Sequence, residues 1–155
     1  MRTGEADSVL SASLFGKEGH MRKAVAYLAV SLDGCIADRD GGVGWLDDFA
    51  YAQEDGGYEA FVQGVDTVGM GGRTYRQVTQ ELSPGAWPYE GLDCRVWTHD
   101  SGPLPHAKRI EGNLAAWLHA EKQKPGRDIW LCGGAELLAA AAAAGEIDRW
   151  HLTVL

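Results

Sequence analysis

One stretch restricts the fold more than any other: the apolar run 129–132, which leads directly into Gly133 and Gly134 and then into an alanine-rich segment. A short apolar run beside turn residues is typical of a buried strand, although periodicity alone does not exclude a buried helix. Paired glycines permit positive φ angles and let another group approach the backbone closely. The free amide groups and positive dipole end of the following helix suit a phosphate group. A strand-to-helix turn without a ligand is the simpler interpretation of this stretch on its own.

Chain length, net charge and the length of the apolar runs limit the number of domains and the kinds of partner. A chain of 155 residues with 45% hydrophobic content predicts one globular domain around one core. The formal net charge of -8 disfavours a nucleic-acid partner, whose binding surfaces are normally basic. No apolar run reaches the length that spans a bilayer, so we expect no membrane partner either.

Cysteine and histidine usage indicates the compartment. The three cysteines lie far apart without a Cys-x-x-Cys motif, and the five histidines lack metal-ligand spacing. We therefore expect a reduced, cytoplasmic protein with no metal site.

The first twenty residues differ in composition from the rest of the chain, because they are mostly small and polar and contain only short apolar patches. Gly19-His20-Met21 resembles a cloning junction, so we expect residues 1–20 to be a tag or extension outside a domain spanning 21–155. An over-long gene start or a genuine extra strand are the alternatives.

Strand-like and helix-like patterns alternate through the remaining sequence. We expect strands at 23–32, 66–70, 94–98, 108–110, 129–132 and 147–155, and helices at 58–65, 73–78, 114–123 and 137–144, the third of them capped by Asn113. Segments 81–92 and 100–106 are predicted loops. This order predicts an α/β layer structure whose central sheet is mostly parallel and flanked by helices.

Small, hydroxylated and basic residues follow several of these strands. In a parallel sheet they would meet at the carboxyl edge, where ligands bind, so their convergence predicts an extended phosphate-bearing ligand. Thr74 could instead cap its helix, and Asp33 could be a turn residue before Gly34. The residues are Asp33, Gly71, Arg73, Thr74, Thr98, Gly133 and Gly134.

A glycine-rich segment, residues 38–44, follows the first strand and closes on Trp45. We expect an exposed, mobile loop, which is either a lid over a ligand or an ordinary surface loop anchored by Trp45.

The order of these pieces resembles the dihydrofolate reductase-like superfamily, and most of all the reductase domain of bacterial riboflavin biosynthesis, the deaminase-reductase C-terminal family. The resemblance rests on Ala29–Ala37, the loop closing on Trp45, Met70–Tyr75, Val96–Thr98 and Leu131–Leu137, and it spans roughly residues 21–155. It implies a three-layer dihydrofolate reductase-like fold. It also implies an NADPH-dependent reductase that transfers hydride to a pyrimidine- or pterin-like ring.

The resemblance also implies roles for individual residues. The cofactor pyrophosphate would lie on Gly71, Thr74, Gly133, Gly134 and Ala135, and Arg73 and Glu136 would also bind the cofactor. Thr98 and His99 would approach the adenosine 2′-phosphate. Ala29, Ile36 and Ala37 would flank the nicotinamide. Asp33 and Trp45 would border the substrate and are the candidate catalytic residues.

Three departures from the family pattern bear on function. Gly72 stands where dihydrofolate reductases have an arginine, and Ala50 stands where they have a proton-donating acid, so classical folate reduction is not expected. The chain stops at Leu155, where family members continue into a hairpin, so we expect an edge strand there and a homodimer. A non-catalytic nucleotide-binding protein and a purely structural α/β domain remain the alternatives.

Overall fold

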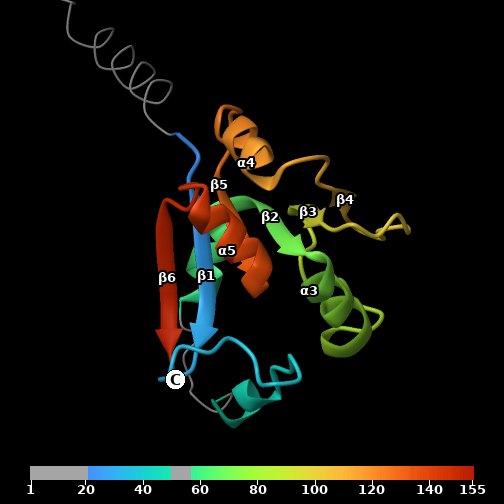
Figure 1. The fold of residues 1–155 in the computed structure, drawn as a ribbon, viewed down its shortest axis with the longest axis vertical. Coiled ribbons are helices and arrows are strands. Elements are labelled where there is room, and N and C mark those ends of the chain that lie inside the picture. Colours follow the sequence, from blue (N-terminus) through green and yellow to red (C-terminus); the bar gives the residue numbers. More distant parts are fainter. Residues whose placement is uncertain (1–20, 50–56) are drawn as a thin grey trace, which may run out of the picture.

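Six strands form one sheet in the order β4-β3-β2-β5-β1-β6, and every neighbouring pair is parallel (Figure 1). The computed structural model describes residues 21–49 and 57–155. The strands are β1 (Ala24–Val30), β2 (Val65–Gly71), β3 (Asp93–Trp97), β4 (Lys108–Arg109), β5 (Asp128–Gly133) and β6 (Arg149–Val154). The helices are the 3-10 helix η1 (Gly44–Phe49), α2 (Tyr58–Gln63), α3 (Gly72–Gln77), the π-helix η2 (Val78–Leu82), α4 (Leu114–Lys122) and α5 (Ala135–Ala143). The predicted α/β class and mostly parallel sheet are confirmed.

The apolar run 129–132 lies in β5, a central strand between β2 and β1. Ile129 and Leu131 point to one face of the sheet and Trp130 to the other, and all three are buried. A strand covered on both faces needs such a continuous apolar sequence.

Helices cover both faces of the sheet. Leu114 and Leu118 of α4, together with Leu137 and Leu138 of α5, pack with the β1 and β5 side chains of one face. The other face carries an aromatic cluster that includes Phe61 of α2, Tyr75 of α3, and Trp130. Asn113 caps α4 as predicted, since its side-chain oxygen accepts a hydrogen bond from the amide of Ala116 at 3.1 Å.

The segment after α3 differs from the prediction. Residues 81 and 82 were expected in a loop, but the chain continues from α3 into the π-helix η2. The hydroxyl of Thr79 donates to the carbonyl of Tyr75 at 2.9 Å, and the amide of Ser83 donates to the carbonyl of Val78 at 2.9 Å. The backbone bond from Ser83 to Val78, five residues apart, continues the helix in π geometry, which the apolar pattern alone does not indicate.

At the amino ends of the strands lies a group of polar side chains, here called the Arg22 cluster: the buried Arg22, Thr67 and Glu121, and the half-buried Asp66. The Arg22 guanidinium donates to Asp66 at 2.6 Å, Thr67 at 2.7 Å and Glu121 at 3.1 Å. It also donates to the carbonyl of Arg127 at 2.6 Å. One side chain thus joins the starts of β1, β2 and β5 to the end of α4.

Strand β6 forms one edge of the sheet. Its side chains Trp150, Leu152 and Val154 are 49%, 48% and 56% exposed. No helix of the described residues is long and apolar enough to cross a membrane. The expectations for residues 1–20 and for Ala50 lie outside the described residues.

Candidate functional site

The carboxyl ends of β2 and β5 lie side by side in the sheet, with Met70 paired to Gly133. A Cβ atom placed on Gly71 would lie 3.7 Å from the amide nitrogen of Gly134 and 3.9 Å from the carbonyl oxygen of Gly133. The two glycine segments therefore face each other without side chains between them. The peptide bond between Gly133 and Gly134 is cis.

Thr74 lies against the same segment. A Cβ atom on Gly134 would come within 3.2 Å of the Thr74 hydroxyl oxygen, and that hydroxyl makes no hydrogen bond to the described part of the chain. Thr74 lies inside α3, whose N-cap residue is Gly71, so it does not cap that helix. We call Gly71, Thr74, Gly133 and Gly134 the glycine cradle.

The start of α5 opens onto the glycine cradle. Its N-cap residue Gly134 offers no side-chain cap, and Leu138 is the first residue whose amide is bonded, to the Gly134 carbonyl at 3.1 Å. The amides of the first turn therefore lack helical acceptors and carry the positive end of the helix dipole. Ala135 and Glu136 belong to this turn and are exposed. Free amides beside a free hydroxyl suit the oxygens of a phosphate group.

A second close approach joins the ends of β2 and β3. A Cβ atom on Gly72 would lie 2.5 Å from the Thr98 hydroxyl oxygen and 3.6 Å from a guanidinium nitrogen of Arg76. Only glycine fits at position 72 without displacing Thr98. The Thr98 hydroxyl accepts from the amide of Asp100 at 3.1 Å, while His99 is exposed.

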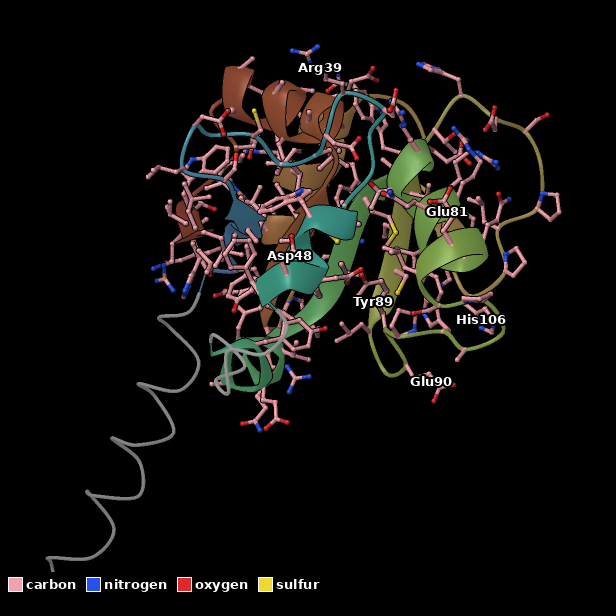
Figure 2. The ribbon with its side chains drawn as sticks, turned by 90° about the horizontal axis from the view of Figure 1, so that it is seen from below. Arg39, Asp48, Glu81, Tyr89, Glu90 and His106 are labelled. Carbon is pink, nitrogen blue, oxygen red and sulfur yellow. The ribbon has the colours of Figure 1, made fainter. Side chains whose placement is uncertain are left out.

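Next to Thr98 lies a cleft of about 580 Å³ between α3–η2 and the segments 83–87 and 98–106. Its walls include Tyr75, Arg76 and the ring of Trp87, which stacks on His106 with ring centroids 5.6 Å apart. Figure 2 looks onto the carboxyl ends of the strands and shows His106 on the same side of the molecule as α3.

Arg73, predicted to add charge at the phosphate site, lies against the glycine-rich loop. Its guanidinium donates to the carbonyl of Asp40 at 3.1 Å, and the neighbouring side chain of Gln77 donates to the carbonyl of Gly41 at 3.1 Å. The loop also bonds to itself, since the Asp38 carboxylate accepts from the amides of Asp40 and Gly42 at 2.9 and 2.7 Å. It runs from β1 beneath the sheet toward α3 (Figure 1), and its predicted mobility stays a prediction.

At the end of β1, Asp33 lies exposed in a turn of residues 31–35. The Ser31 hydroxyl donates to its carboxylate, and this hydrogen bond lowers the pKa of Asp33. The partners of Asp33 are local, as the turn interpretation expects. Ala29, Ile36 and Ala37 are half-buried nearby in the chain, and Trp45 lies in η1 with its ring edge-on to Phe49 at 6.4 Å between centroids.

The face of the sheet next to Gly133 is aromatic, and the ring of His151 also packs on it, with its centroid 4.6 Å from that of Tyr27. Burial raises the pKa of the Cys132 thiol to about 11, and the Tyr89 hydroxyl lies 3.7 Å from its sulfur. Burial also raises the pKa of Tyr89. Tyr27 stacks on Phe61 on the same face, with centroids 4.1 Å apart. Such an aromatic surface suits a planar ring. Among residues 21–49 and 57–155, no group of His, Cys, Asp or Glu side chains could hold a metal ion.

Sequence reasoning missed Arg76 and Asp100, whose side chains pair at 2.6 Å beside Thr98. One signal was present: Arg76 lies four residues after Gly72, so on a helix the two share a face. The local sequence pattern does not indicate that Asp100 pairs with Arg76, because the two residues are 24 positions apart in the chain.

No protein-family model matches the chain. It is 42% identical over 136 residues to the uncharacterized protein YwjB of Bacillus subtilis (strain 168), an alignment that covers 86% of this chain and 76% of that protein. It is 26% identical over 150 residues to the uncharacterized protein YyaP of the same organism, with 86% and 74% covered.

Solved structures show the same fold. A Shewanella sp. PV-4 protein with a provisional riboflavin-biosynthesis name superposes with a TM-score of 0.73 at 24% identity, covering 86% of this chain and 76% of that one. The Thermotoga maritima diaminohydroxyphosphoribosylaminopyrimidine deaminase/5-amino-6-(5-phosphoribosylamino)uracil reductase gives a TM-score of 0.52 at 18% identity, covering 79% of this chain and 42% of that one. The chain therefore belongs to the family of Bacillus subtilis YwjB and has the α/β fold of riboflavin biosynthesis reductase-like proteins.

Proposed function

We propose that this protein is an NADPH-dependent reductase that transfers hydride to a pyrimidine- or pterin-like ring. The observation that carries the proposal is the glycine cradle, where Gly71 faces the Gly133–Gly134 backbone and the Thr74 hydroxyl, which has no partner among residues 21–49 and 57–155, adjoins it. Two segments far apart in the sequence, 71–74 and 133–134, supply this one opening at the carboxyl edge, where parallel sheets bind ligands.

The residues present fit a dinucleotide pyrophosphate. The open α5 amides would donate to its oxygens, and the Thr74 hydroxyl would donate from the opposite side. A side chain at position 71 would reach toward the Gly134 amide and fill the opening, which gives Gly71 a role beyond turn formation. When bound, the nicotinamide supplies the hydride, so the protein's task is positioning and the exclusion of water.

The aromatic face beside Gly133 supports a flat heterocycle as the substrate. Its nearest groups are the neutral Cys132 thiol and the Tyr89 ring, with Tyr27 on the neighbouring strand. Such a surface favours stacking of a flat heterocycle over binding of a charged chain. The likeness to structures named for riboflavin biosynthesis supports a pyrimidine intermediate among such heterocycles.

A second candidate is a nucleotide-binding protein without turnover. Reduction of a ring also requires a proton, but the catalytic candidate Asp33 is an exposed carboxyl that is ionised at neutral pH, and the Ser31 hydroxyl lowers its pKa further. A carboxylate in that state is a poor proton donor, and its partners lie within its own turn. This observation favours binding without chemistry.

The first experiment is a titration of the protein with NADPH and NADH, followed by tryptophan fluorescence. The matched variant is Gly71→Ala, which fits sterically because the new methyl would meet its nearest atom at 3.7 Å and Gly71 has a φ of −76°. We expect micromolar NADPH binding by the wild type, with at least a roughly tenfold loss in the variant and an unchanged melting temperature. Absence of binding to either dinucleotide would refute the cofactor site.

Turnover is tested separately. Purified protein, NADPH and the pyrimidine intermediate named for the Thermotoga enzyme are mixed, and the absorbance of reduced nicotinamide is followed. Its decrease supports the reductase, whereas NADPH binding without any decrease across pyrimidine and pterin substrates supports the second candidate.

A further inference from the structure

Tyr58, the first residue of α2, carries a hydroxyl group that makes no hydrogen bond to the described part of the chain. Tyr58 is 37% exposed, so water reaches it. Two other tyrosines differ in this respect. The Tyr75 hydroxyl donates to the carbonyl of Pro105 at 2.8 Å. The Tyr89 hydroxyl lies 3.7 Å from the Cys132 sulfur. The Tyr58 hydroxyl is therefore open to a ligand.

Tyr58 lies on the aromatic face of the sheet that leads to the glycine cradle. Its ring centroid is 5.8 Å from that of Trp130 and 6.3 Å from that of Tyr27. Cys132 packs on the same face and directly precedes Gly133. Because β2 begins directly after α2 at the amino edge of the sheet, the first residue of α2 lies on the carboxyl side. A flat ring on this face would thus lie within the surroundings of the Tyr58 hydroxyl.

Reduction of a C=N bond needs a proton as well as a hydride. When bound, the reduced nicotinamide supplies the hydride to the carbon and is oxidised. The C=N bond is reduced, and negative charge develops on its nitrogen. A neutral phenol is a stronger acid than the amine that forms, so it can protonate this nitrogen. Asp33 does not fill this role, because it is ionised at neutral pH.

We propose that the Tyr58 hydroxyl donates this proton to the substrate nitrogen. This inference rests on the proposed function. The O–H bond of Tyr58 breaks as the new N–H bond forms, and the phenolate then regains a proton from water at the exposed side chain. Tyr58 is thus a catalytic residue that takes the place of a carboxylic acid.

The surroundings of Tyr58 keep its hydroxyl protonated. Burial raises the pKa of Tyr58, and the neighbouring Cys132 and Tyr27 raise it further. A phenol with a raised pKa holds its proton throughout the neutral range, where an ordinary carboxylic acid has lost its own. The titratable side chains that adjoin Tyr58 or its neighbour Tyr27 are Cys132, Tyr89, His151 and, on α2 itself, Glu59.

The first test compares the wild type with Tyr58→Phe. The substrate is 5-amino-6-(5-phosphoribosylamino)uracil, the pyrimidine in the name of the Thermotoga enzyme. Single-turnover oxidation of NADPH, followed by absorbance, should be roughly 100- to 10,000-fold slower in Tyr58→Phe. The dissociation constant of NADPH and the melting temperature should stay unchanged. Glu59→Gln is the matched control, because Glu59 is the exposed neighbour on α2, and it should react like the wild type.

A second measurement does not depend on turnover. In protein labelled with carbon-13 at the tyrosine ζ carbons, the Tyr58 resonance is identified by its absence in Tyr58→Phe. Adding the pyrimidine together with NADP+, which has no hydride to give, should shift this resonance. Such a shift reports contact between the hydroxyl and the bound ring.

The outcomes separate this inference from the proposed function. If the wild type binds NADPH but reduces neither the pyrimidine nor a pterin, both are overturned. If it reduces a substrate while Tyr58→Phe reacts equally fast, or if the Tyr58 resonance does not move, the reductase stands and the role of Tyr58 is overturned. A Tyr58→Phe variant that loses NADPH binding or melts at a lower temperature would assign Tyr58 to structure, which also overturns it. Equal slowing in Glu59→Gln would overturn the assignment in favour of the carboxyl group.

Discussion

The guanidinium of Arg22 lies 3.1 Å from the carboxylate of Glu121, and both side chains are almost fully buried, with 4% and 5% exposed. Two residues 99 positions apart thus form an ion pair inside the protein. Their remaining hydrogen-bonding groups also have partners, because Arg22 reaches Asp66 and Thr67 and Lys124 reaches Glu121 at 2.9 Å. Replacing both members of such a buried pair by apolar residues changes the free energy of unfolding little. Removing one member leaves the other charge buried without its partner and destabilises the fold strongly.

Replacing Arg22 by methionine should lower the free energy of unfolding by about 3 kcal/mol or more, because Glu121 would remain buried without its main counter-charge. Urea unfolding followed by circular dichroism measures this change. Arg149→Met, at an exposed site, should unfold like the wild type. Equal stabilities of Arg22→Met and the control would show that the ion pair contributes nothing.

Acid should destabilise the protein through Asp66. Burial raises the pKa of this carboxyl, but the Arg127 amide, the Thr67 hydroxyl and Arg22 outweigh it, so that its pKa lies below the usual value. As the pH falls below about 4, the unfolded chain takes up the proton first and the free energy of unfolding decreases. Urea titrations between about pH 3 and pH 7 should show this slope, and Asp66→Asn should be less stable at neutral pH with a flatter acid limb. A wild-type slope retained in Asp66→Asn would assign the effect to other carboxyls.

The three thiols should differ in reactivity. Cys35 is exposed, whereas Cys94 is buried with a raised pKa and the pKa of Cys132 is about 11. Because the thiolate is the reactive form, Ellman's reagent at mildly alkaline pH should modify one thiol in the native protein and all three after unfolding. Cys35→Ser should abolish the native reaction. Rapid modification of a second thiol would show that burial does not protect Cys132 or Cys94.

Gly72→Ala should destabilise the protein, because its methyl carbon would lie 2.5 Å from the Thr98 hydroxyl oxygen and 2.8 Å from the Thr98 Cβ atom. We expect a loss of about 1–3 kcal/mol in the free energy of unfolding. Adding Thr98→Gly should recover part of this loss by removing both close atoms. Gly71→Ala serves as the neighbouring control, since its methyl group has room. No difference between the two alanine variants would argue against the close packing at Thr98.

We expect a homodimer that pairs through β6. This edge strand exposes Trp150, Leu152 and Val154, and a second copy of the strand would satisfy both its free backbone groups and these side chains. Sedimentation should show a dimer for the wild type and a monomer for Leu152→Lys. Ala142→Lys, at an exposed position of α5, should leave the dimer intact. A wild type that stays monomeric at all concentrations would refute the interface.

Features that depend on neighbouring residues could be predicted from the sequence. The apolar run ending in Gly133 became β5, and Asn113 became the cap of α4. The alternation of strands and helices predicted a largely parallel sheet, and every strand pair is parallel. From that sheet followed the meeting of Gly71 and Gly134, because the carboxyl ends of parallel strands share an edge.

Features that depend on long-range side-chain contacts could not be predicted. Arg73 has the composition of a phosphate ligand, yet its guanidinium binds the loop at Asp40, and only the packing of that loop on α3 reveals this. The pairing of Arg76 with Asp100 and the burial of Arg22 likewise depend on how distant segments meet. A sequence pattern specifies which side of an element is apolar but not which distant polar group faces it.

The parallel sheet separates the Arg22 cluster, at the amino ends of the strands, from the glycine cradle at their carboxyl ends. We therefore expect substitutions at one of these two edges to have effects on stability that are independent of the other edge. Substitutions around Thr98 should leave the hydrogen bonds of the Arg22 cluster intact, because the two groups of residues lie at opposite ends of the strands. The carboxyl edge of the sheet could therefore be redesigned while the Arg22 cluster keeps the starts of β1, β2 and β5 joined to α4.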